Sequence, residues 1–302
     1  MLFLNAKYKT PSSRKEAKYM KSLICNGSKV SYQGFGNPEN PCIIFLHNGG
    51  SDHSIWSPIA ERLVNTHYIL SLDWPGFGQS ETMPSDFGLQ AYTQVLAEFI
   101  DQLQLKNITL VGQCLGSATA LNYCRLVNGQ GIKSLILFNV LTPKTLSHSA
   151  NLFIQVKQRP SLNGVYKWLE NKLPQSEFAR NYFVNYQIKN GNNVSGKSKT
   201  HLSNLYIGPR NIHNLISLAE ALPSFKNLDS LEKTEEFPPT LVIWSKKNKV
   251  LPYKQGKAFI KHFKPDEAVI LNGGHLVMLE KEAECAGIIK SFGTSHAIPS
   301  TK

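Results

Sequence analysis

One cysteine in the chain lies between two glycines, in the segment Gly112-Gln113-Cys114-Leu115-Gly116. The apolar run before it predicts a short buried strand, and the residues from Ser117 to Leu121 predict the first turns of a helix. Glycine has no Cβ, so it allows a turn sharp enough to present the central side chain, as in a nucleophile elbow. A helix N-terminus also stabilises a thiolate. We therefore expect Cys114 to be an exposed, activated nucleophile.

The other cysteines have no such context. A free cysteine usually behaves as a small buried hydrophobe, and this is the interpretation for Cys25, Cys42, Cys124 and Cys285. Five widely spaced cysteines, an odd number, favour a reducing compartment over a disulfide framework. The chain has no Cys-x-x-Cys pair, so a structural zinc site is not expected. We expect neither a metal nor a cofactor.

Length and composition favour one α/β core with a smaller subdomain, because the chain has 302 residues, 41% of them hydrophobic and 18% charged. No apolar stretch approaches the ~20 residues of a membrane span, and the polar, basic N-terminus lacks the apolar centre of a secretory signal. A cytoplasmic protein is expected. The net charge of +12 is spread along the sequence without a recognisable nucleic-acid module, so nucleic-acid binding is not expected.

Apolar runs alternate with helical patterns through most of the chain, which predicts a mainly parallel sheet with helices on its faces. Helical spacing extends from Ser54 to Val64, from Gln90 to Leu103 and from Tyr253 to Phe263. The predicted strands are 29–32, 42–46, 68–72, 108–111, 135–138, 241–244 and 268–271.

The alternation pauses over residues 141–231, which contain helical stretches rich in aromatic residues and a Gly/Asn/Ser-rich loop. We expect this segment to be a helical cap inserted over the strand ends. Residues 26–140 and 232–302 would form the core, and residues 1–25 a loosely held leader.

From about Val30 to Phe292, the chain resembles the α/β-hydrolase superfamily, and specifically its small members with a helical cap. Four motifs carry the resemblance, in the family's order. They are the oxyanion-type loop Leu46-His47-Asn48-Gly49-Gly50, the turn Asp73-Trp74-Pro75-Gly76-Phe77-Gly78-Gln79-Ser80, the elbow at Cys114, and Gly273-Gly274-His275 after the last predicted strand. The resemblance implies an α/β-hydrolase fold, with a mostly parallel central sheet, flanking helices and a helical cap insertion.

The resemblance also implies roles for particular residues. His275 matches the family's catalytic histidine, and Asn248 stands where the family carries an aspartate, so the predicted triad is Cys114-His275-Asn248. The oxyanion hole would consist of the backbone N–H of Leu115 with that of Asn48 or Gly49. The residues expected around the substrate are His47, Gln113, Asn139 and Trp74. His47 also has a structural interpretation within its loop. Asn139 is an amide at a position where some relatives carry a relocated acid.

The two departures from the family pattern, cysteine for serine and asparagine for aspartate, are chemically consistent with each other. A serine hydroxyl needs a histidine supported by a carboxylate, whereas a thiol near an imidazolium and a helix N-terminus can form a standing thiolate–imidazolium pair. A neutral amide then only has to orient the ring. We expect acyl transfer or hydrolysis of an ester, lactone or thioester through a Cys114 acyl-enzyme, with a preference for a thioester.

Alternative interpretations stay open at this point. The missing carboxylate also fits a catalytically inactive binding protein on the same fold, and the fold hosts cofactor-independent lyases and oxygenases. The basic residues near Asn248, namely Lys246, Lys247 and Lys249, are either a solvated surface or a site that attracts a substrate carried by an acyl-carrier protein or coenzyme A.

Overall fold

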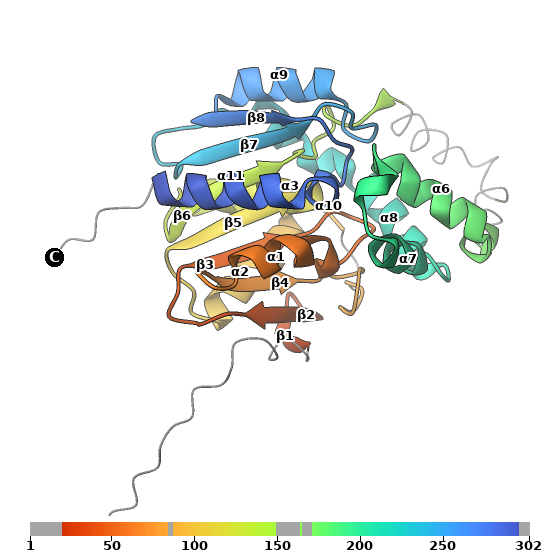
Figure 1. The fold of residues 1–302 in the computed structure, drawn as a ribbon. Coiled ribbons are helices and arrows are strands. Elements are labelled where there is room, and N and C mark those ends of the chain that lie inside the picture. Colours follow the sequence, from red (N-terminus) through yellow and green to blue (C-terminus); the bar gives the residue numbers. More distant parts are fainter. Residues whose placement is uncertain (1–19, 84–86, 149–163, 165–170, 296–302) are drawn as a thin grey trace, which may run out of the picture.

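A central sheet of eight strands organises the molecule, in the order β1-β2-β4-β3-β5-β6-β7-β8 (Figure 1). The computed structural model describes residues 20–83, 87–148, 164 and 171–295. The strands from β3 to β8 run parallel, and β1 and β2 add an antiparallel edge. The strands are β1 Lys21–Cys25, β2 Ser28–Phe35, β3 Cys42–Leu46, β4 Tyr68–Leu72, β5 Ile108–Gln113, β6 Ile132–Phe138, β7 Thr240–Ser245 and β8 Glu267–Leu271.

Helices cover both faces of the sheet, and this explains why the central strands are continuous apolar runs rather than alternating ones. One buried cluster joins the sheet to α2 (Leu89–Gln102), α3 (Leu115–Leu126) and α9 (Tyr253–Phe263). A second cluster, on the opposite face, joins it to α1 (Ser57–Leu63), α10 (Val277–Glu280) and α11 (Glu282–Ser295). The 3₁₀ turn η1 (His53–Trp56) directly precedes α1, whose first turn contains Pro58, a position where a missing N–H costs no helical hydrogen bond.

The segment between β6 and β7 forms the cap. Its helices α6, α7 and α8 lie together beside the ends of the strands (Figure 1). The described elements of the cap are η3 Leu173–Gln175, α6 Glu177–Gln187, η4 Gly191–Asn193, α7 Gly196–Asn204, α8 Arg210–Glu220 and η5 Leu222–Ser230. Residues 149–163 and 165–170 of the predicted cap lie outside the described residues. None of the described helices combines the length and the apolarity that a membrane crossing requires.

The predicted fold class is confirmed, and each predicted strand is present. The ranges 42–46 and 68–72 match the observed strands, and the other strands differ by up to three residues at an end. The predicted leader is wrong at its C-terminal end, because Lys21–Cys25 is strand β1 and pairs antiparallel with β2. Only Cys25 of this edge strand is fully buried, so the segment lacks the apolar run by which the inner strands are detected.

Candidate functional site

Cys114 lies in the sharp turn between β5 and α3, as the glycine spacing predicted. Its backbone has φ 53° and ψ −106°, a left-handed conformation that is strained for a residue with a side chain. The flanking glycines are sterically required: a Cβ on Gly112 would lie 2.6 Å from the Gly116 carbonyl oxygen, and one on Gly116 would lie 2.7 Å from the Leu46 Cβ. The turn therefore holds the thiol at the strand end by backbone geometry.

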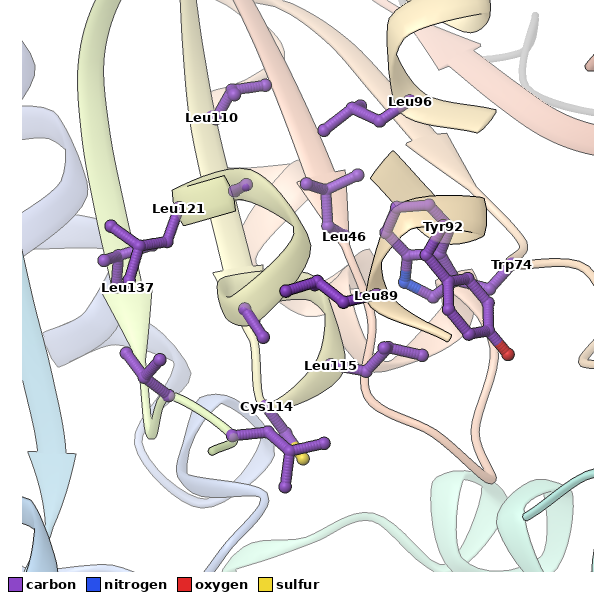
Figure 2. Close-up of a cluster of buried hydrophobic side chains, with 14 of the residues drawn as sticks. Leu46, Trp74, Leu89, Tyr92, Leu96, Leu110, Cys114, Leu115, Leu121 and Leu137 are labelled. Atoms are coloured by element: carbon purple, nitrogen blue, oxygen red, sulfur yellow. The ribbon is translucent and has the colours of Figure 1, made fainter. Parts of the chain in front are cut away.

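The thiol is buried in this conformation, which corrects the expectation of an exposed thiolate. Cys114 is 7% exposed and packs in the cluster that contains Leu115, Leu89 and Trp74 (Figure 2). Burial raises the pKa of Cys114 to about 12, and the backbone N–H of Leu115, which hydrogen-bonds to this residue, opposes the rise only in part. At neutral pH the side chain is a thiol, since desolvation outweighs the helix N-terminus.

His275 and Asn248 are in direct contact, as predicted for two members of the triad. The His275 Nδ1 lies 3.2 Å from Asn248 Oδ1. That oxygen also accepts the backbone N–H groups of Val250 and Leu251, each at 2.9 Å, so the orientation of the amide is determined. Because Oδ1 can only accept, His275 must donate from Nδ1, and its Nε2 carries the lone pair of a general base. Burial lowers the pKa of His275 to about 3, so the ring is neutral.

The predicted contact between Cys114 and His275 is not formed in this conformation. No hydrogen bond among the described residues joins the Cys114 Sγ to the His275 ring. Instead, Gln113 Nε2 lies 3.4 Å from His275 Nε2 and donates to the His275 carbonyl oxygen at 2.8 Å. The ring nitrogen that would act as the base therefore faces the Gln113 amide.

Gln113 and Asn139 form a buried amide network below the histidine. Asn139 Nδ2 donates to Gln113 Oε1 at 3.2 Å, and Asn139 Oδ1 accepts the Ser245 N–H at 2.9 Å. Both side chains are 0% exposed. Their polar atoms contact the ends of β5, β6 and β7 and the His275 backbone, and a contact with substrate stays a prediction.

His47 and Trp74 likewise connect two loops of the core. His47 Nε2 accepts the Trp74 backbone N–H at 2.8 Å, and Trp74 Nε1 donates to the His47 carbonyl oxygen at 2.9 Å. Both residues are 0% exposed. These contacts agree with the structural interpretation of His47, and substrate contacts of the two side chains stay a prediction.

The predicted oxyanion loop follows β3 and lies under the cap. The Asn48 side chain folds onto its own loop: Nδ2 donates to the Gly49 carbonyl oxygen, and Oδ1 accepts the Ser51 hydroxyl at 2.7 Å. The backbone N–H groups of Asn48 and Gly49 take part in no hydrogen bond within the described part of the chain. A Cβ on Gly49 would lie 2.6 Å from Leu218 Cδ2 of α8, so the cap closes directly over these donors.

Two histidine–carboxylate contacts lie beside this loop. Asp73 accepts His53 Nδ1 at 2.8 Å within the core, and Asp52 accepts His201 Nε2 of α7 at 2.7 Å, across the junction of cap and core. The Asp52 hydrogen bond raises the pKa of His201. Burial would raise the pKa of Asp52, but its hydrogen bond and charge interaction with His201 hold that pKa well below its usual range. Among the described residues, no three His, Cys, Asp or Glu side chains gather as a metal site would require.

A family model described as the alpha/beta hydrolase fold matches residues 41–282, which is most of the chain. The chain belongs to the alpha/beta hydrolase fold family. Its strand order, its elbow and the position of His275 after the last strand agree with this membership.

The proteins to which the chain is similar include a dioxygenase and esterases. The chain is 25% identical over 122 residues to 1H-3-hydroxy-4-oxoquinoline 2,4-dioxygenase of Pseudomonas putida, and 27% identical over 125 residues to putative esterase/lipase 3 of Mycoplasma pneumoniae. These matches cover 40% and 41% of this chain but only 46% and 44% of the relatives. A thermophilic esterase from Thermogutta terrifontis superposes with a TM-score of 0.75 at 16% identity, over 93% of this chain and 100% of that one. The last likeness shows the fold alone.

The sequence analysis missed Glu280 and the cap residues that lie over the oxyanion loop. Glu280 is only 7% exposed and ends the apolar run Leu276-Val277-Met278-Leu279. An acidic residue at the end of such a run, five positions after His275, was the one available signal. Nothing in the local sequence of α8 indicated that Leu218 would pack on Gly49, because a contact 169 positions away in the chain depends on the tertiary fold.

Proposed function

We propose that this alpha/beta hydrolase fold protein is an acyl-transfer enzyme that forms a Cys114 thioester with the acyl group of an ester or thioester. The observation that carries the proposal is the elbow. A strained backbone at Cys114, with Leu115 N–H bonded to that residue, costs stability and is otherwise unnecessary for packing a cysteine. The likeness to putative esterase/lipase 3 of Mycoplasma pneumoniae supports the same class of reaction.

The neutral resting state defines the order of proton transfer. His275 Nε2 would take the thiol proton as Sγ forms a bond to the acyl carbon, because neither group is charged beforehand. The oxyanion would receive the N–H of Leu115 and that of Asn48 or Gly49. Collapse would break the bond to the leaving group, which takes the proton from His275, and a water or second acceptor would then release the acyl group.

Before this reaction, the His275 ring must exchange its Gln113 contact for the thiol. The contact at 3.4 Å is long for a hydrogen bond, so it opposes this exchange only weakly. Asn248 would stabilise the Nδ1–H tautomer throughout, which is the role of the amide in Cys-His-Asn sites.

A thioester substrate is the finer part of the proposal. Cys114 and His275 are both buried, and a site that excludes water favours transfer of a thioester acyl group to an amine or thiol over hydrolysis. Lys246, Lys247 and Lys249 are exposed in the loop that contains Asn248. Their charge would attract an acyl group delivered by an acyl-carrier protein or coenzyme A.

Intact-protein mass spectrometry with a 4-nitrophenyl ester and with acyl-coenzyme A tests the proposal. The wild type should gain one acyl group, the Cys114→Ala variant should gain none, and Cys42→Ala should behave as the wild type because this partly exposed thiol lies at the start of β3. Acylation of Cys114→Ala to the wild-type level would overturn the proposed nucleophile.

Two other outcomes identify the alternatives. Ligand binding without acylation or turnover would indicate a binding protein. A reaction that consumes oxygen and survives Cys114→Ala would place the chain with the chemistry named for its Pseudomonas putida relative instead.

A further inference from the structure

Glu280 is a buried carboxylate that the proposed reaction does not use. It lies at the end of α10 and is 7% exposed. Its Oε1 accepts the Gly274 N–H at 2.7 Å and the Lys189 N–H at 3.1 Å, and its Oε2 accepts the Asn190 N–H at 3.0 Å. No cationic side chain forms an ion pair with it among the described residues. Backbone donors alone therefore compensate the buried charge, and hydrogen bonds to a carboxylate are among the strong ones.

These donors come from two different parts of the molecule. Gly274 directly precedes His275, whereas Lys189 and Asn190 belong to the segment by which the chain leaves cap helix α6. The carboxylate therefore bridges the histidine loop and the cap.

Two further contacts extend the bridge to residues on both sides of the histidine. The Leu276 N–H donates to the Gln187 carbonyl oxygen at 3.1 Å, and Lys189 Nζ donates to Asn272 Oδ1 at 2.9 Å. Alternate residues of the segment 272–276 are thus joined to residues 187–190 of the cap, with His275 inside the joined segment.

Gly274 shows how closely the two segments approach. A Cβ at this position would lie 2.5 Å from the Lys189 nitrogen, 2.7 Å from the Gln187 carbonyl oxygen and 2.8 Å from Glu280 Oε1. Any side chain at position 274 would therefore separate the cap exit from the histidine loop.

We propose that Glu280 is a positioning residue that couples the cap to His275, so that the exit of α6 and the histidine loop open and close as one unit. This inference rests on the proposed function in taking His275 as the general base, but the coupling itself is a property of the backbone. A cap displaced by an entering substrate would move the segment on both sides of His275, which would supply the change needed to release Nε2 from Gln113.

Hydrogen–deuterium exchange tests the coupling without an activity assay. In the wild type, the amides of Gly274, Leu276, Lys189 and Asn190 should exchange with one common opening rate. Glu280→Gln replaces an acceptor by a donor that faces a backbone N–H, so exchange should become at least about 10-fold faster in both segments together. The matched control is Glu284→Gln, a neighbouring exposed glutamate that pairs with Lys281 on the surface, and it should leave both segments unchanged.

Kinetics separate positioning from simple loss of stability. With an activated ester, Glu280→Gln should lower kcat by about 10-fold or more with KM within about threefold, at a temperature where the variant is fully folded. The inference would be overturned if the two segments of the wild type exchanged at different opening rates, or if Glu280→Gln sped up exchange in one segment only. An unchanged kcat of Glu280→Gln would overturn it as well. If Cys114→Ala kept full activity, the proposed function would fail, while the exchange experiment would still decide the coupling.

Discussion

The structure predicts that the Cys114 thiol reacts more slowly than a free thiol, whereas the sequence alone predicts that it reacts faster. Burial raises the pKa of Cys114 to about 12 and lowers that of His275 to about 3, so neither group is charged at neutral pH. A pKa of about 12 leaves about one thiol in 10⁵ ionised at pH 7, whereas an ordinary thiol with a pKa of about 8.5 is about 3% ionised. The thiolate is the nucleophile in alkylation, so the Cys114 rate should be about 10³-fold below that of a free thiol.

The assay is alkylation by iodoacetamide, followed at the Cys114 peptide by mass spectrometry. A Cys42→Ser background removes the most exposed of the five cysteines. Between pH 6 and about pH 10 the rate should rise about 10-fold per pH unit without a plateau. His275→Ala should change it by no more than about threefold, because a neutral ring supplies no charge to stabilise the thiolate. A plateau with a midpoint below about pH 8, abolished by His275→Ala, would refute this reasoning and indicate a standing ion pair.

Three further predictions follow from the site and its surroundings. Asn248→Ala should lower kcat about 10-fold or more, because it removes the contact with His275 Nδ1. Asn248→Asp should retain activity and raise the pKa of His275, so that the acid limb of the pH–rate profile shifts to higher pH. His201→Gln should lower Tm most below about pH 6.5 and progressively less as pH rises through the raised pKa of His201. The reason is that a histidine with a raised pKa adds stability to the fold only while it is protonated. An equal loss of Tm at all pH values would contradict this prediction. Turnover of acyl-coenzyme A, but not of a neutral ester, should fall between 0.1 M and 1 M salt, because the screening length shrinks from about 10 Å to about 3 Å. Lys247→Glu should reduce the difference in salt sensitivity between the two substrates. Equal salt sensitivity of both substrates would leave the basic loop without a role in delivery.

Much of the fold was predictable, because its signals are local. Continuous apolar runs identified the strands that helices cover on both faces, and the glycines beside Cys114 identified the elbow. The resemblance to the α/β-hydrolase superfamily, rather than a local signal, implied Asn248 as the partner of His275, and the two side chains are in contact. Strand β1 was not predictable in this way, since an edge strand with one buried residue has the composition of a polar loop.

Side-chain contacts between distant parts of the chain were not predictable from the sequence. Gln113 and Asn139 are polar residues at strand ends, and a polar residue there is as consistent with substrate binding as with a buried network. Glu280 carried a weak signal, but its three donors come from positions 189, 190 and 274, which only the folded chain brings together.

The sequence by itself determined the sheet, the elbow and the identity of the residues at the strand ends, because hydrophobic periodicity and glycine sterics act over a few neighbouring positions. Only the tertiary structure decided the charge state of Cys114 and His275, since a pKa depends on desolvation by residues distant in the chain. It also decided that Nε2 of His275 faces Gln113 and that the cap is joined to the histidine loop through Glu280, because these contacts depend on the relative placement of elements far apart in sequence.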